Sequence, residues 1–208
     1  MTGCSDSCSA DLGKASPAER HTLIVVLVLN AGMFLAEFSA GLVAGSTALL
    51  ADSLDMLADA LIYALGLFAL GRAAHWRSRA ALASGLFQLA LGTGVAGQAV
   101  AKVFLDGLPD AATMGFFGVL ALLVNTACFL LLARFRHGDI NLRATWICSR
   151  NDMIGNVGVL VAAGLVILLD SMWPDIVIGL LIALLVIRSA LRIIAEARSE
   201  LSSQGRNH

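Results

Sequence analysis

The chain has 208 residues, of which 58% are hydrophobic and 14% are charged, and its formal net charge is −1. Ordinary soluble domains carry about 25% charged residues, so this composition excludes that class of protein. The balanced charge gives no indication of a nucleic-acid partner, and the length favours a single domain.

The charged residues are placed so that several long segments have almost none. Residues 22–51 contain one charge, Glu37, and residues 80–101, 111–133 and 153–169 contain no charge. About 20 helical residues cross the hydrocarbon core of a bilayer, so such segments are typical of membrane-spanning helices. The first of them is too long for the hydrophobic part of a signal peptide. The pattern therefore predicts an all-α membrane protein with no signal peptide.

In chain order, we predict six transmembrane helices, at about residues 22–44, 47–71, 80–103, 111–134, 142–169 and 174–195. Charged residues interrupt the second and the sixth, but only a helix satisfies the backbone polar groups of such segments in lipid. The six helices form one transmembrane domain over residues 22–195. We expect residues 1–21 to form a polar, disordered leader, and residues 196–208 to form a short cytoplasmic tail with no room for another folded domain.

Five acidic residues fall inside the predicted spans, where an ionisable side chain is costly and therefore indicates a function. They are Glu37, Asp52, Asp55, Asp59 and Asp152. A helix turns by about 100° per residue, which places Asp52, Asp55 and Asp59 within about 60° of one another. Asp55 and Asp59 form an i,i+4 pair on one face of the second helix. On the fifth helix, Cys148 and Asp152 form another, and Gly155 on the same face would let a neighbouring helix approach.

Two such pairs on facing helices would supply four side-chain ligands, the number that a tetrahedral metal site uses. Three carboxylates in a medium of low dielectric repel one another unless a divalent cation or protons lie between them. Exchange of metal for protons is a natural coupling, because metal ligands must be deprotonated. A thiolate beside carboxylates suits zinc, cadmium, cobalt or ferrous iron. The predicted metal ligands are Asp55, Asp59, Cys148 and Asp152.

The other polar residues of the spans have structural interpretations. Asp52 either adds to the site or only accepts a hydrogen bond from a neighbouring helix. For Glu37 we favour an ion pair with Arg150. We assign interhelical contacts to Asn30, Asn151 and Asn156, packing to Cys128, Met33, Met56 and Met153, and positions outside the spans to His21, His75, His137 and His208.

The polar leader contains Cys4 and Cys8, which could bind a soft metal, although such a leader is more often only disordered. The other two cysteines, Cys128 and Cys148, lie in apolar segments, which argues against a disulfide framework.

These features resemble the cation diffusion facilitator family of metal–proton antiporters. The resemblance is carried by the second-helix run Leu50-Ala51-Asp52-Ser53-Leu54-Asp55-Met56-Leu57-Ala58-Asp59 and the fifth-helix run from Cys148 to Val159, with Asn30, Glu37, Gly41 and Ser46 in the first-helix pattern. In that family, paired (His or Asp)-xxx-Asp motifs on the second and fifth helices form the transport site. Asp55 and Asp59 match the first motif and Asp152 the second, with Cys148 where His or Asp is usual.

The resemblance implies a six-helix, cation-efflux-type transmembrane domain that exports metal from the cytoplasm as protons enter, with zinc the usual cargo. It also implies a homodimer, which small residues on the third helix, Gly94, Gly97 and Ala101, could support. Members usually carry a ferredoxin-like cytoplasmic domain after the sixth helix, which we expect this chain to lack. Cys148 is the second departure, and it changes the expected metal preference.

Two other functions compete with transport. CDP-alcohol phosphotransferases are membrane enzymes that also have six helices and an aspartate cluster. In the present chain, Met56 follows Asp55 where those enzymes have Gly, and no Gly-xxx-Asp-xxx-Asp segment follows. A non-transporting membrane subunit, in which the acids only hold helices together, would not need three aspartates on one face.

Topology follows from the basic residues, which gather in alternate connections. They lie before the first helix, in and beside the second and fourth connections, and near the C-terminus, at Lys14, Arg20, Arg72, Arg77, Arg79, Arg134, Arg136, Arg143, Arg188, Arg192, Arg198 and Arg206. The first, third and fifth connections contain only Lys102. Positive residues mark the cytoplasmic side, so both termini of this inner-membrane protein are predicted to be cytoplasmic.

Single cysteines introduced near positions 75, 108 and 137 test this topology in a chain freed of its own cysteines. A membrane-impermeant reagent added to intact spheroplasts should label the cysteine near 108 and leave the other two unlabelled until the membrane is opened. Labelling near 75 or 137 in intact spheroplasts would overturn the topology.

Overall fold

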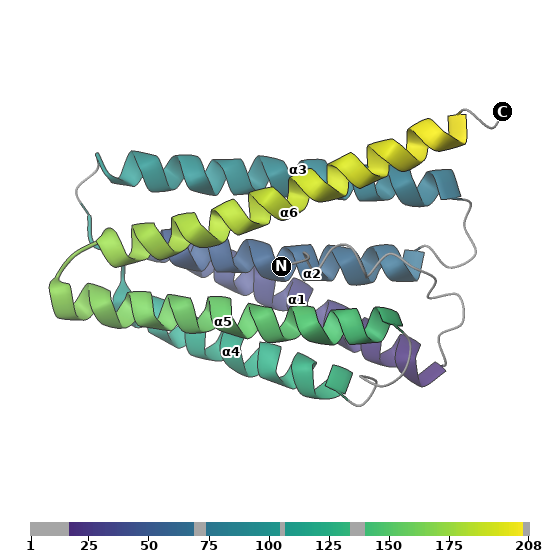
Figure 1. Cartoon of the computed structure of the whole chain (residues 1–208). Helices are drawn as coiled ribbons and strands as arrows, with labels where there is room; N and C mark the ends of the chain where they lie inside the picture. Colours follow the sequence, from purple (N-terminus) through teal and green to yellow (C-terminus); the bar gives the residue numbers. More distant parts are fainter. Residues whose placement is uncertain (1–16, 69–73, 105–106, 134–139, 206–208) are drawn as a thin grey trace.

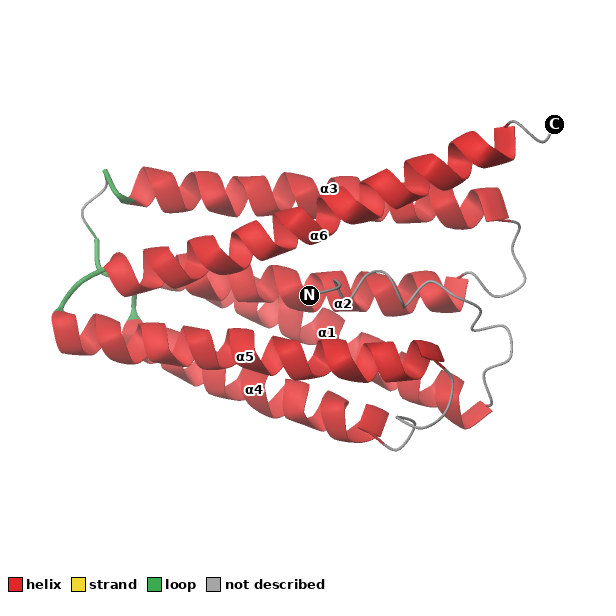
Figure 2. Cartoon of the chain, in the orientation of Figure 1, coloured by secondary structure: helices red, strands yellow, loops and turns green. Residues whose placement is uncertain are grey.

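The computed structural model describes residues 17–68, 74–104, 107–133 and 140–205, except for the side chains of residues 19, 66, 74, 140–151 and 203–205. These ranges form six helices: α1 (Pro17–Ala44), α2 (Thr47–Phe68), α3 (Ala74–Lys102), α4 (Ala111–Ala133), α5 (Ile140–Leu169) and α6 (Trp173–Gly205). The helices lie side by side in one bundle, and the described residues contain no strand (Figures 1 and 2). The predicted all-α architecture of six helices is confirmed.

Three helices extend further than predicted, because an apolar segment marks only the part of a helix inside the membrane. α1 begins at Pro17, a residue type favoured in the first turn of a helix. α3 begins at Ala74 and α6 continues to Gly205, beyond the predicted bounds of 80 and 195. These two extensions support each other, since the hydroxyl of Ser78 donates a hydrogen bond of 2.6 Å to Glu200.

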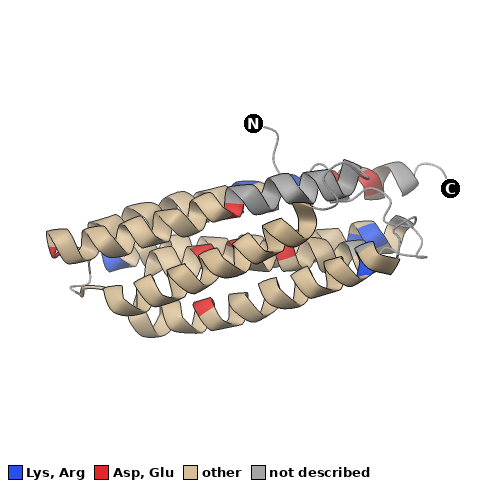
Figure 3. Ribbon diagram, turned by 90° about the horizontal axis from the view of Figure 1, so that it is seen from below, with Lys and Arg blue, Asp and Glu red and all other residues tan. Residues whose placement is uncertain are grey.

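The second helix is the centre of the bundle and contacts all five others. Those five are long and apolar enough to cross a membrane, whereas the aspartates of α2 give it too many charges to qualify on composition. Its leucines Leu49, Leu50 and Leu54 are fully buried among the neighbouring helices. Figure 3 shows several acidic residues midway along the bundle and others at its ends. The surrounding helices therefore separate the acids of α2 from lipid.

A tight turn joins α1 to α2. Gly45 has a φ of 62°, a left-handed conformation that glycine adopts without strain. The amide of Ser46 then donates a 3.0 Å hydrogen bond to the carbonyl of Gly41, which closes a Schellman motif at the end of α1. The turn leaves the first amides of α2 pointing toward the start of α6.

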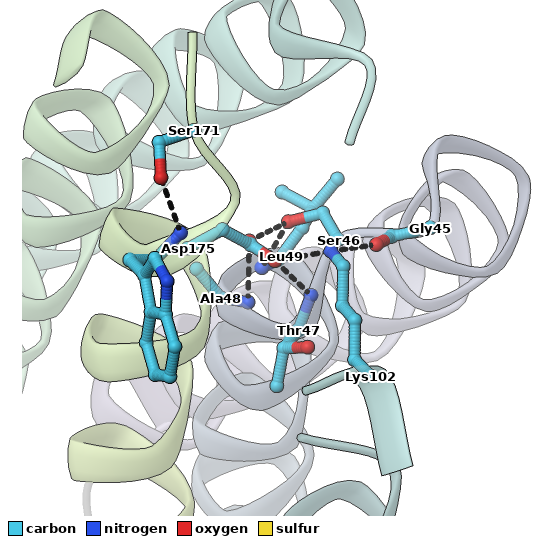
Figure 4. Close-up of polar contacts among 9 residues, drawn as sticks. Gly45, Ser46, Thr47, Ala48, Leu49, Lys102, Ser171 and Asp175 are labelled. Carbon is cyan, nitrogen blue, oxygen red and sulfur yellow. Dashed lines mark hydrogen bonds and ion pairs between the residues drawn. The ribbon is translucent and has the colours of Figure 1, made fainter. Parts of the chain in front are cut away.

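Asp175, in the first turn of α6, binds those amides (Figure 4). Its carboxylate accepts hydrogen bonds from the backbone N–H groups of Thr47, at 2.9 Å, and Ala48, at 3.0 Å. It also accepts one from the hydroxyl of Ser46, at 2.6 Å. Asp175 is completely buried, and it caps a helix to which it is not connected in sequence.

Lys102, at the end of α3, completes this cluster. Its ammonium lies 2.7 Å from the Asp175 carboxylate and donates a further hydrogen bond to the carbonyl of Gly45. Gly179, one turn along α6, lets that helix lie against α2, because a Cβ atom there would come within 2.6 Å of the backbone at Thr47 and Ala48. We call this set of contacts, made by Gly45, Ser46, Thr47, Ala48, Lys102 and Asp175, the terminal clamp.

Replacement of Asp175 by Ala should lower the stability of the protein. It removes the cap of α2 and leaves the partly buried Lys102 ammonium without its partner, a loss of about 3 kcal/mol for a buried ion pair. The melting temperature of the purified protein in mild detergent is the measurement.

Replacement of Lys102 by Met gives the matched control, because the two residues share one interaction. The melting temperature of the double variant should lie well above the value expected if the two single losses were added. An Asp175→Ala protein that melts like the wild type would show that the clamp contributes nothing.

Candidate metal site

Three of the predicted ligands meet between α2 and α5. Asp55 and Asp59 lie one turn apart on α2, and the carboxyl group of Asp152 on α5 interacts with both of them. Asp59 is only 8% exposed and accepts a 3.0 Å hydrogen bond from the hydroxyl of Tyr63. One oxygen of Asp152, Oδ2, is buried and has no hydrogen-bond partner.

The fourth predicted ligand, Cys148, lies in α5 one turn before Asp152. Its side chain is outside the described residues. Among the side chains that are described, no group of three or more His, Cys, Asp or Glu residues is arranged to hold a metal ion. The three aspartates are therefore neighbours, and an ion would have to draw their oxygens closer together.

Asp52 takes part in a chain of hydrogen bonds across three helices. The amide of Asn156, on α5, donates a 2.7 Å hydrogen bond to Asp52 Oδ2. The amide of Asn125, on α4, donates a 3.0 Å hydrogen bond to the side-chain oxygen of Asn156. The interpretation of Asn156 as an interhelical contact is confirmed, and Asp52 does accept a hydrogen bond from a neighbouring helix.

Glu37, on α1, is fully buried beside Asp52. Neither of its carboxyl oxygens accepts a hydrogen bond from a described N–H or O–H group, but its carboxyl group lies within hydrogen-bonding reach of that of Asp52. The described residues form no ion pair with it. Arg150, its predicted partner, has a side chain outside the described residues. Two buried carboxyl groups thus lie next to the three predicted ligands.

Two further polar side chains illustrate what the sequence could and could not reveal. Tyr63 is four residues after Asp59, so the i,i+4 rule alone could have indicated their contact. Asn125 has no such signal, because its partner Asn156 lies on another helix. Cys128 is buried among apolar side chains and receives a long contact of 3.7 Å from the Asn30 amide, in agreement with its predicted packing role.

Asp55 is the one partly exposed residue of α2 between Thr47 and Ala60. Every residue from Ser46 to Leu54 is at most 1% exposed, whereas Asp55 and, on α5, Asp152 are partly exposed. The terminal clamp lies at the buried end of this stretch. The stretch of α2 between the clamp and Asp55 is thus fully buried, Asp55 and Asp152 are partly exposed, and Asp59 is buried.

Comparison with known proteins gives the family. Residues 23–202 match the model of the cation efflux transmembrane domain. The chain is 31% identical over 198 residues to the zinc transporter ZitB of Pectobacterium atrosepticum, covering 86% of this chain and 60% of the relative. It is 30% identical over 195 residues to the zinc transporter ZitB of Escherichia coli, covering 86% of this chain and 61% of the relative.

A third relative is the cadmium, cobalt and zinc/H(+)-K(+) antiporter of Bacillus velezensis, 26% identical over 195 residues that cover 86% of this chain and 62% of that protein. The chain thus spans about 60% of the length of these curated relatives. Its match to the family model includes parts of all six helices. The chain belongs to the cation efflux family, which is a family of transporters and not of membrane enzymes.

Proposed function

We propose that this protein is a secondary transporter that exports a divalent transition-metal cation from the cytoplasm in exchange for protons. The observation that carries the proposal is the meeting of Asp55, Asp59 and Asp152 inside an apolar bundle. Among the described residues, none of these three carboxyl groups forms an ion pair with a basic side chain. Three acids without a counter-charge require a cation or protons, and a transporter can exchange one for the other.

Cys148 completes the proposed site from the turn of α5 that precedes Asp152. Three carboxylates and one thiolate would give the four ligands of a tetrahedral ion. The names of the relatives specify zinc in two cases, and cadmium, cobalt and zinc in a third. For the present chain we propose the same class of ions, with zinc first and ferrous iron also compatible with the ligands.

Proton exchange follows from the same ligands. A metal ion binds the thiolate and carboxylate forms, so its entry releases protons and a fall in pH opposes its binding. The fully buried stretch from Ser46 to Leu54 supports a site that is closed toward the predicted periplasmic end. Export would then require the clamp end to open.

Transport of the purified protein in lipid vesicles tests this function. Zinc uptake driven by a pH difference is expected for the wild type and should be lost with Asp152→Ala. Ser53→Ala is a matched control, because Ser53 is buried on α2 but its hydroxyl donates only to the carbonyl of Leu50. A wild type that moves no zinc, cadmium, cobalt or ferrous ion would refute the proposal and leave the non-transporting subunit.

The identity of the fourth ligand gives a sharper prediction. Cys148→Ser removes the soft ligand, so cadmium transport should fall more than manganese or ferrous transport. Cys148→Asp should restore transport of the harder ions and leave cadmium poor, and Cys148→His should favour zinc. The transport of each ion is measured in turn in vesicles of clamped pH. Transport of every ion should weaken as the pH falls on the side from which the ion is loaded.

An equal effect of Cys148→Ser on every ion, or no effect, would mean that this cysteine only packs in the bundle. The metal preference proposed here would then have no basis, although the three aspartates could still form a transport site.

We also propose a homodimer. Gly94, Gly97 and Ala101 share one exposed face of α3, and a Cβ atom at Gly94 or Gly97 would meet nothing within 4 Å. Gly85 and Gly92 lie on the other face, against isoleucines of α6. Small exposed residues on a membrane helix allow close approach of a second helix.

Mass measurement of the protein in mild detergent and in lipid nanodiscs should give twice the chain mass. Gly97→Leu should shift the protein to the monomer and leave its melting temperature close to that of the wild type. A wild-type monomer in both media would contradict the proposal.

A further inference from the structure

We propose that Tyr63 helps to select the transported cation, because it holds the Asp59 carboxylate so that one of its two oxygens is left for the ion. The inference rests on the proposed function, since Asp59 is a ligand of the same site. Tyr63 acts through Asp59 and does not touch the ion, so it is a positioning residue. It is also the only tyrosine of the chain.

The contact joins two side chains one helical turn apart on α2. The hydroxyl of Tyr63 donates a 3.0 Å hydrogen bond to Oδ2 of Asp59. Tyr63 is 2% exposed and Asp59 is 8% exposed, so little water competes for either group. A hydrogen bond to an ionised carboxylate, the form that binds metal, is stronger than one between neutral groups. The bond therefore fixes the orientation of the Asp59 carboxylate.

The ring of Tyr63 is held in place as well. It belongs to an apolar cluster with Leu23 and Val26 of α1 and with Cys128 and Leu132 of α4. All of these side chains are at most 2% exposed. A ring packed in this way cannot turn aside unless the cluster opens. The hydroxyl is thus a fixed outer partner of the kind that orients a metal ligand.

The hydrogen bond favours binding of the ion through one oxygen of Asp59. Among the described residues, no N–H or O–H group donates to the other oxygen, Oδ1. Binding through both oxygens would require Oδ2 to share its lone pairs between the ion and the Tyr63 hydroxyl. One atom from each of the four proposed ligands is what a tetrahedral ion needs.

Tyr63 supplies its donor without a positive charge. An arginine or lysine at this position would form an ion pair with Asp59 and compete with the cation, whereas a neutral hydroxyl leaves the charge of the carboxylate to the ion. The described residues form no ion pair with Asp59. The site therefore gains a fixed ligand and keeps its attraction for a cation.

The consequence is a preference among ions. Zinc accepts four ligands, whereas manganese prefers six oxygen ligands and would gain from a carboxylate that binds through both oxygens. By holding Oδ2, Tyr63 favours zinc over manganese. This selection differs from that of the Cys148 thiolate, which separates soft ions from hard ones.

Binding of zinc and of manganese to the purified full chain in detergent, measured by equilibrium dialysis, tests the selection. Tyr63→Phe keeps the ring and removes only the hydroxyl. It should weaken zinc binding about tenfold, the lower end of the loss typical for an outer partner of a metal ligand, and should not weaken manganese binding. Ser53→Ala removes another buried hydroxyl of α2, one that donates only to the carbonyl of Leu50, and should leave both ions unaffected.

Because the chain has a single tyrosine, a second measurement needs no substitution. Tyrosine labelled with carbon-13 at Cζ should give the wild type one resonance. That resonance should shift when zinc saturates the protein, because an ion on Asp59 draws charge from Oδ2 and weakens the hydrogen bond. A resonance that stays in place while dialysis shows bound zinc would overturn the role of Tyr63 and leave the proposed transport site standing.

Equal weakening of both ions in Tyr63→Phe would also overturn it, as would unchanged zinc binding in a variant that melts like the wild type. In either case the hydroxyl would serve only the packing of the bundle. A wild type that binds no zinc would refute the proposed transport site together with the role of Tyr63.

Discussion

The rest of the structure depends on the need to keep the carboxyl groups of α2 out of lipid. A helix with aspartates at 52, 55 and 59 cannot face hydrocarbon, because an exposed charge at the bilayer centre costs several kcal/mol. The other five helices contact α2 and bury it from Thr47 to Ala60, with only Asp55 partly exposed in that stretch. Their own lipid-facing surfaces can be almost wholly apolar because the ionisable groups are collected on the central helix and on the positions that face it.

A central helix of this kind must also be held in register, since its acids have to meet partners on α1 and α5. The terminal clamp fixes one end, where Asp175 binds the first amides of α2 and Lys102 neutralises the carboxylate. Farther along, Asn156 ties Asp52 to α5. Both contacts are made from helices that come much later in the chain. The position of α2 along the bundle axis is therefore set by directed polar contacts as well as by close packing, such as that of Gly179 on the backbone at Thr47 and Ala48.

Four of the six helices could be predicted because segments with almost no charge mark membrane spans directly, and the second and sixth because backbone polar groups in lipid need a helix. The pairing of Asp55 with Asp59 followed from helical periodicity. The polar ends of α3 and α6 could not, since the Ser78 to Glu200 contact that supports them joins residues far apart in sequence. For the same reason, the sequence did not predict the cap that Asp175 forms on α2. Nor did it predict the chain of hydrogen bonds from Asn125 through Asn156 to Asp52. Periodicity shows which residues share a face, but the rotation and order of the helices decide which faces meet.

The buried carboxyl groups also explain why stability and transport would be coupled in this bundle. If they were ionised together, the acids on α2 and their neighbours Glu37 and Asp152 would repel one another at low dielectric, so the proposed mechanism places either protons or a cation among them. At the proposed site, a metal ion would remove the same repulsion and would link α2 to α5. Either occupant would then stabilise the packing. Exchange of metal for protons would then follow from the need to keep one set of buried charges neutral, with no separate coupling device.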